Sequence, residues 1–109
     1  MGYATVAAVI DYNLTDTLAD AQYIPVENAE FGSIQVPAGI TSVTLTYYAC
    51  DTEDGTYLAA YDGTTALTDT VAASRAVKMK AGVIEGRAYI KIIGNADDTL
   101  NADLKIVLQ

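Results

Sequence analysis

Few side chains in this sequence could carry out catalysis, and most of them are carboxylates. The 109 residues include no histidine, which removes the usual general base and the commonest metal ligand. Cys50 is the single cysteine and has no histidine to activate it, so a cysteine-dependent hydrolase is excluded. Paired carboxylates can hydrolyse glycosides, but the acidic residues at 51–54 and 97–98 fall in predicted turns, where Asp commonly bonds the backbone. We therefore expect no enzymatic activity and no cofactor.

The turn at 51–55 (DTEDG) is the main candidate for a metal site. Ca²⁺ prefers several oxygen ligands, and the weak candidates here are Asp51, Glu53 and Asp54. The turn lacks the D-x-[DN]-x-[DN]-G spacing, followed by a distant Glu, that is typical of a calcium-binding loop. An Asp-Gly pair is typical of a plain β-hairpin, which we favour over a calcium site. The acidic loop at 94–98 presents the same two alternatives.

The charge of the chain is unevenly distributed. The net charge is −8, and residues 1–74 contain ten acidic residues and no Lys or Arg, whereas residues 75–109 contain six basic and four acidic residues. Such a balance offers no general phosphate-neutralising surface, so nucleic acid is not an expected partner. The apolar run at 4–10 follows no basic segment and is too short to span a bilayer, so we expect neither a secretion signal nor a membrane segment.

The stretch from 33 to 62 organises the predicted fold. Residues 41–50 alternate in the way that a strand with two distinct faces requires. We expect neighbouring Tyr47 and Tyr48 to differ, with one ring buried and the other facing outward. The Asp-Gly pair in the following turn would supply a left-handed backbone, and residues 57–61 would form the return strand.

The remaining elements are short and are separated by turn-forming residues. The pattern predicts one helical turn at 80–86, between two glycines. At the first predicted strand, residues 4–10, the alanines make a helix the alternative. Residues 1–20 are also a candidate for a partly extended N-terminal arm. The piece around Pro25 belongs at a sheet edge, because proline cannot donate to a strand ladder. The further strands are expected at 4–10, 23–26, 31–36, 68–71, 75–79, 87–93 and 104–108.

Seven or eight short strands about ten residues apart indicate an all-β fold. We expect residues 1–109 to form a single antiparallel β-sandwich domain, an eight-stranded jelly roll or a related sandwich. Eight of the nine aromatic residues are tyrosines, which suit contact surfaces as well as the rim of a core. The candidate interface residues are Tyr48, Tyr57, Tyr61, Arg75, Lys78 and Arg87.

A succession of motifs between about residue 20 and the end of the chain carries a resemblance. It comprises an apolar strand that ends in a Pro-Ala step, an Asp-Gly turn before an aromatic, an Ala-Ser-Arg step and a late aromatic-Ile-Lys strand. The matching residues are Val36, Pro37 and Ala38; Asp54, Gly55 and Tyr57; Ala73, Ser74 and Arg75; and Arg87, Tyr89, Ile90 and Lys91. In this order the motifs resemble small virion proteins of tailed bacteriophages. The chain departs from them in its acidic turn at 51–54 and in lacking tryptophan.

The resemblance implies a capsid-associated β-sandwich of the decoration or cement type. Such a protein would bind the outside of a phage head, after assembly in the host cytoplasm, and stabilise contacts between major capsid subunits. A domain of this size buries little surface against one neighbour, so we expect a homo-oligomer, a trimer, whose several weak contacts add up. A fainter likeness to galactose-binding jelly rolls implies a module for carbohydrate or a host surface. Another virion part, in the tail or in head completion, is the third alternative.

Overall fold

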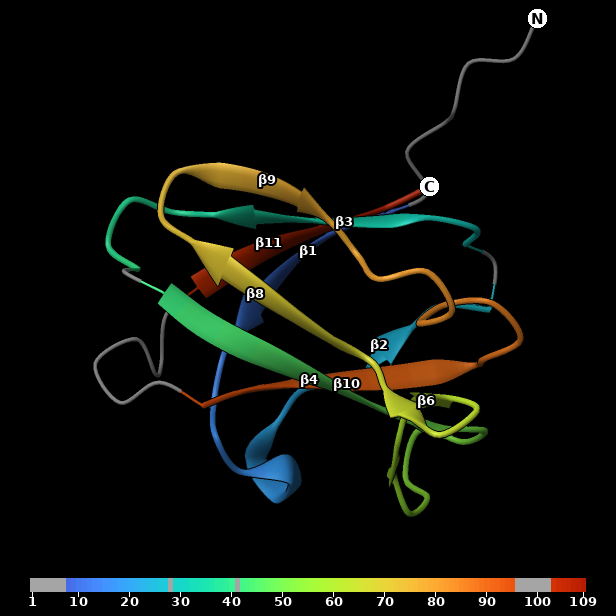
Figure 1. Ribbon diagram of the computed structural model, residues 1–109. Helices are drawn as coiled ribbons and strands as arrows, with labels where there is room; N and C mark the ends of the chain where they lie inside the picture. Colours follow the sequence, from blue (N-terminus) through green and yellow to red (C-terminus); the bar gives the residue numbers. More distant parts are fainter. Residues whose placement is uncertain (1–7, 28, 41, 96–102) are drawn as a thin grey trace, which may run out of the picture.

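Two antiparallel sheets pack face to face around the core in the computed structural model, which describes residues 8–27, 29–40, 42–95 and 103–109 (Figure 1). The first sheet consists, in spatial order, of β1 (Ala8–Asn13), β11 (Asp103–Leu108), β3 (Gly32–Val36) and β9 (Arg75–Lys78). The second consists of β2 (Ile24–Pro25), β10 (Tyr89–Gly94), β4 (Ser42–Cys50) and β5 (Leu58–Ala59), with β8 (Thr68–Ala72) also paired to β4. The other described elements are the β6 (Tyr61–Asp62) and β7 (Thr65–Ala66) hairpin and the 3-10 turn η1 (Leu18–Asp20).

Alternation along the longer strands builds the core. Every second residue of β10, of β11 and of β4 as far as Tyr47 is buried, because successive side chains of a strand point to opposite faces. Tyr47 is fully buried and Tyr48 is half-buried on the outer face, so the prediction for this pair is confirmed. The fully buried branched side chains of the two sheets that meet in the core include Ile34, Leu45, Ile90, Ile92, Leu104 and Ile106.

The β5 and β8 strands form one interrupted strand along the edge of β4. Both run antiparallel to β4 and pair with successive parts of it. Between them, the Ala60 N–H donates to the Tyr47 carbonyl at 2.9 Å, and the Leu67 N–H donates to the Ala60 carbonyl at 2.9 Å. The β6–β7 hairpin is therefore looped out from a strand that resumes its register at Leu67. Ala60 and Leu67 are buried at the base of the hairpin, whereas residues 61–66 are exposed.

A side chain, rather than a strand, completes the other edge of the second sheet. The β2 strand pairs with one end of β10, and Thr15 bridges Ile93 near the other end. Between them, the Tyr12 hydroxyl accepts a hydrogen bond from the Ile92 N–H at 2.9 Å. The same hydroxyl lies 2.9 Å from the carbonyl oxygens of Ile92 and Gln22, which share its single proton as acceptors. Burial raises the pKa of Tyr12 to about 12.

The first strand continues further than the sequence predicts. Residues 4–7 of the predicted strand lie outside the described residues, and β1 runs on to Asn13 through a segment predicted to be a turn. Pairing with β11 supports this extension, and the Gln22 side chain accepts a hydrogen bond from the Asn13 N–H at 2.7 Å. Of the candidate arm at 1–20, residues 8–13 form β1 and residues 18–20 form η1, and residues 1–7 lie outside the described residues.

Two glycine-based predictions are wrong in detail. Residues 80–86 form consecutive turns instead of a helical turn, with Gly82 and Gly86 at φ values of 93° and 72°. These left-handed conformations favour glycine and interrupt a helix. Gly55 does not have a positive φ, although an Asp-Gly hairpin turn was expected to supply one. Its lack of a side chain instead leaves room for the Cys50 sulfur.

Most of the predicted strands are confirmed to within two residues at each end. The described residues form eleven strands rather than seven or eight, because the count includes four that are only two residues long. The short strand at Pro25 lies at a sheet edge, as predicted, and pairs only with β10. No helix among the described residues has the length and apolar character needed to cross a membrane.

Candidate functional site

The acidic turn at 51–55 lies against the outer face of the second sheet. The Glu53 carbonyl accepts a hydrogen bond from the Tyr57 hydroxyl at 3.1 Å. The Glu53 carboxylate accepts a hydrogen bond from the Tyr23 hydroxyl, and this raises the pKa of Tyr23. No three or more His, Cys, Asp or Glu residues in the described part of the chain are grouped as metal ligands would be. Asp51, Glu53 and Asp54 are therefore not brought together as a calcium site.

Tyr57 supports this turn from beneath and is not available to a partner. It is buried, although it was a candidate interface residue, and the Lys91 ammonium lies 4.6 Å from its ring centroid. Desolvation raises the pKa of Tyr57 to about 12. The Lys91 ammonium also donates to the Leu18 carbonyl at 3.3 Å, which ties η1 to β10.

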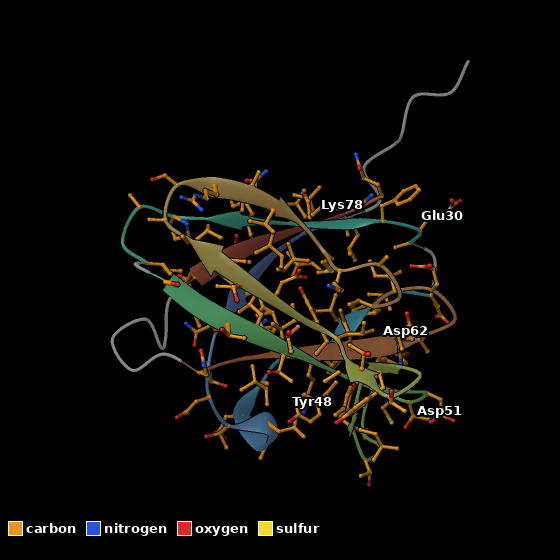
Figure 2. The ribbon with its side chains drawn as sticks, viewed as in Figure 1. Glu30, Tyr48, Asp51, Asp62 and Lys78 are labelled. Carbon is orange, nitrogen blue, oxygen red and sulfur yellow. The ribbon has the colours of Figure 1, made fainter. Side chains whose placement is uncertain are left out.

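The other candidate interface residues are distributed over different surfaces. Arg75 and Lys78 are exposed on β9, at the edge of the first sheet. Tyr61 is 52% exposed on the looped-out hairpin, and Tyr48 lies on the outer face of the second sheet (Figure 2). Arg87 is half-buried, and its Nε donates to the Gly82 carbonyl at 3.1 Å, so it braces a turn. The structure brings only Arg75 and Lys78 together in one strand.

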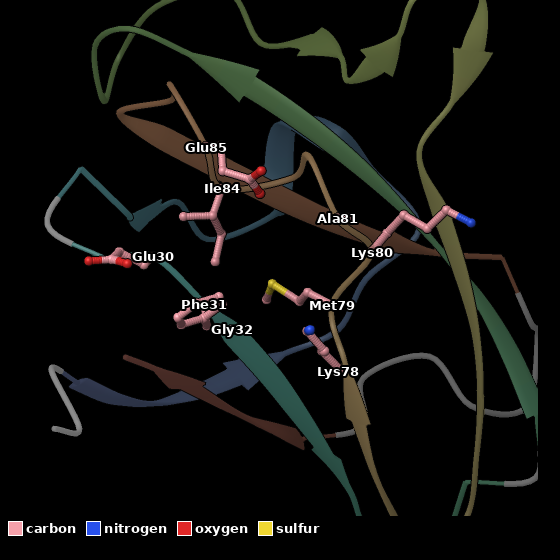
Figure 3. Close-up of a pocket in the computed structure, with 9 residues that line it drawn as sticks. All are labelled: Glu30, Phe31, Gly32, Lys78, Met79, Lys80, Ala81, Ile84 and Glu85. Atoms are coloured by element: carbon pink, nitrogen blue, oxygen red, sulfur yellow. The ribbon is translucent and has the colours of Figure 1, made fainter. Parts of the chain in front are cut away.

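A pocket of about 280 Å³ at the end of β9 was not anticipated from the sequence. We call it the Phe31 pocket (Figure 3). Met79 and Ile84 form its buried floor and pack against Gly32. A Cβ atom at Gly32 would lie 2.7 Å from the Met79 sulfur and 2.9 Å from the Ile84 Cδ1 atom, so a side chain there would displace the ends of both. Its full lining is Glu30, Phe31, Gly32, Lys78, Met79, Lys80, Ala81, Ile84 and Glu85.

The wall and rim of the Phe31 pocket combine an aromatic ring with charges of both signs. Phe31 is 52% exposed, and the Lys78 ammonium lies 5.9 Å from the centroid of its ring. The carboxylates of Glu30 and Glu85 stand on the rim with Lys78 (Figure 3). The Glu85 Oε1 accepts a hydrogen bond from the Gly82 N–H at 3.0 Å, which holds the loop beneath it. An apolar floor with a charged rim suits the binding of an apolar side chain from a partner.

Asp69 anchors the start of the loop that lines the pocket. Its Oδ2 accepts hydrogen bonds from the Tyr47 hydroxyl at 2.6 Å and from the Lys80 N–H at 2.8 Å. Burial and the hydrogen bond to Asp69 raise the pKa of Tyr47 well above its usual value. The loop that follows β9 is therefore fixed to the second sheet, which holds the pocket open in one shape.

The edge of β9 beside the pocket carries peptide groups that face away from its sheet. The Met79 N–H donates to the Gly32 carbonyl at 2.9 Å, which fixes the alternation of hydrogen bonds between β9 and β3. The N–H and C=O groups of Ala76 and Lys78 therefore point to the outer edge, where both residues are exposed. Such an edge can pair with a segment of another chain.

The sequence shows no direct sign of the Phe31 pocket. Its lining comes from three short segments, 30–32, 78–81 and 84–85, that meet only in the fold. The sole phenylalanine, which precedes a glycine, is the nearest signal, and this position was predicted as the start of a strand. Comparisons with protein-family models, with curated proteins and with solved structures find no match to this chain.

Proposed function

We propose that this chain is a structural virion protein, a non-enzymatic decoration or cement protein on the outer surface of a phage head. Its partners are the major capsid protein and further copies of itself, in a trimer that stabilises contacts between capsid subunits. The resemblance to small virion proteins of tailed bacteriophages suggested this function, and the strand order of the two sheets is the structural observation that supports it.

The strand order supports a jelly roll as the finer description of the fold. With β5 and β8 counted as one interrupted strand, and the β6–β7 hairpin left out, the chain has eight strands. Numbered along the chain, they lie in the order 1-8-3-6 in one sheet and 2-7-4-5 in the other. This is the order that two interlocked Greek keys produce in a jelly roll, an architecture common in viral capsid proteins and lectins.

The exposed charges support docking to a larger assembly. The turn at 51–54 and Asp62 present carboxylates to solvent, near one another at the same end of the molecule (Figure 2). Such groups would face Lys or Arg on a capsid subunit and steer its approach. We expect release from the particle to increase with ionic strength, because salt screens contacts between exposed charges.

The copy number on purified virions tests the proposal. Quantitative mass spectrometry of particles washed at low salt should give a number of copies comparable to that of the major capsid subunits. A copy number far below that of the shell subunits would overturn the proposal. Such a number would instead support a role in the tail or in head completion.

A carbohydrate- or host-surface-binding module is the second candidate. Tyr23 and Tyr89 favour it, because their rings meet edge to face on the surface, with centroids 5.7 Å apart and an interplanar angle of 81°. Exposed tyrosine rings can stack on sugars and donate hydrogen bonds. Glycan-array binding that is lost in Tyr89→Ala, with no binding to capsids, would favour this function over the first.

A further inference from the structure

We infer that the β6–β7 hairpin of one copy of this chain docks into the Phe31 pocket of a second copy, with Tyr61 as the inserted side chain. The inference rests on the self-association in the proposed function and assigns the two surfaces that make it. The hairpin projects from the edge strand, and Tyr61 is its exposed aromatic residue. The pocket is the complementary concave surface of the same chain.

The dimensions of the pocket favour one inserted side chain over a small-molecule ligand. Its volume of about 280 Å³ lies at or below the lower end of the usual range for ligand sites, roughly 300–1,000 Å³. Its floor of Met79 and Ile84 is apolar, as the ring of a tyrosine requires. The carboxylates of Glu30 and Glu85 on the rim can accept a hydrogen bond from its hydroxyl. Tyrosines seated in such pockets are frequent energetic centres of interfaces.

Charge complementarity favours the same pairing. Asp62 follows Tyr61 directly, and residues 61–66 contain no basic residue, so the hairpin is anionic. The Lys78 ammonium stands at the pocket beside Phe31, where the hairpin would arrive, whereas the Lys80 side chain points away from the pocket (Figure 3). The contact would therefore join the acidic first part of one chain to the basic residues after position 74 in another.

The placement of the two surfaces allows the contact to close on itself. Asp62 of the hairpin and Glu30 of the pocket rim lie toward the same end of the molecule (Figure 2). A contact between two different surfaces forms a closed ring when a rotation relates successive copies. The free edge of β9 offers the peptide groups of Ala76 and Lys78 to the incoming hairpin.

Sedimentation velocity of the full chain, from roughly 1 to 100 µM, tests this inference for binding free energies of about 5.5–8 kcal/mol. We expect concentration-dependent association of the wild type. Tyr61→Ala and Phe31→Ala should each weaken association at least about 30-fold, as expected for the anchor and wall of a hot spot. Val9→Ala is the matched control, because Val9 is 55% exposed on β1 and lies outside both surfaces. A wild type that stays monomeric, or a Tyr61→Ala protein that associates equally well, would overturn the inference.

Charge exchange provides a second test that does not depend on the apolar substitutions. Asp62→Lys and Lys78→Glu should each weaken association, and the two together in one chain should restore it. Failure of the double variant to recover any association would contradict the pairing.

The outcome is separable from the proposed function. Virions that carry many copies of a chain that is monomeric in solution would refute only the inference, and self-association without capsid binding would refute only the function.

Discussion

Replacing Tyr12 with phenylalanine should destabilise the protein even though it removes a single oxygen atom. The ring is kept, so no cavity forms, and the loss is confined to hydrogen bonds. The Ile92 N–H loses its acceptor, and the carbonyl oxygens of Ile92 and Gln22 lose the single proton that they share, in a region where Tyr12 is fully buried. A buried polar group without a partner costs about 1–3 kcal/mol. We expect the free energy of unfolding to fall by about 2 kcal/mol. The unfolding entropy of about 2.1 cal/mol/K per residue converts this into a fall in Tm of roughly 8 °C.

Urea unfolding followed by far-UV circular dichroism measures this loss directly, with equal slopes indicating an unchanged two-state transition. Tyr48→Phe is the control, because the Tyr48 hydroxyl has no hydrogen-bond partner within the described ranges. Its effect should stay within about 0.5 kcal/mol. A Tyr12→Phe protein as stable as this control would refute the idea that the hydroxyl completes the edge of the sheet.

Three further outcomes follow from contacts in the core. A double-mutant cycle on Tyr47→Phe and Asp69→Asn should give a coupling energy of about 1.5–3 kcal/mol for their 2.6 Å hydrogen bond; additive effects would contradict it. The pKa of Tyr12 is raised to about 12 in the folded protein, so its hydroxyl ionises at lower pH in the unfolded chain. The free energy of unfolding should therefore fall between pH 10 and 12, and less steeply in Tyr12→Phe. Gly32→Ala should destabilise by about 1–3 kcal/mol, because its Cβ would lie 2.7 Å from a methionine sulfur. Gly39→Ala, with nothing within 4 Å, should match the wild type in thermal denaturation; equal Tm values for both variants would contradict the close approach.

Side-chain alternation made the sandwich predictable from the sequence. The ends of some strands could not be predicted, because they depend on pairing with distant strands. The buried faces of β4, β10 and β11 can be read from single residues, because each strand has one apolar and one polar side. The end of β1 could not be read in this way. Asp11 and Asn13 are turn-forming residues, and their pairing with β11, together with the Gln22 side chain, holds them in a strand.

The candidate site was harder to predict because it depends on contacts between distant segments. Tyr57 was expected on the surface, but the Lys91 side chain covers it from a strand more than thirty residues away. Phe31 was expected to begin a strand, yet it precedes β3 and its ring is 52% exposed, beside a loop that Asp69 holds in place. The residue types gave no sign of either arrangement, because neither involves a local spacing.

The looped-out hairpin also makes this protein a potential carrier of foreign peptides. Ala60 and Leu67 are hydrogen-bonded to each other across its base, so the two ends of the looped-out segment lie next to each other in the edge strand. The length of a segment inserted between such adjacent ends matters little, since each doubling of a flexible loop costs only about 0.6 kcal/mol. An epitope or affinity tag grafted between Asp62 and Thr65 would be displayed at the exposed tip of the hairpin while both sheets keep their register.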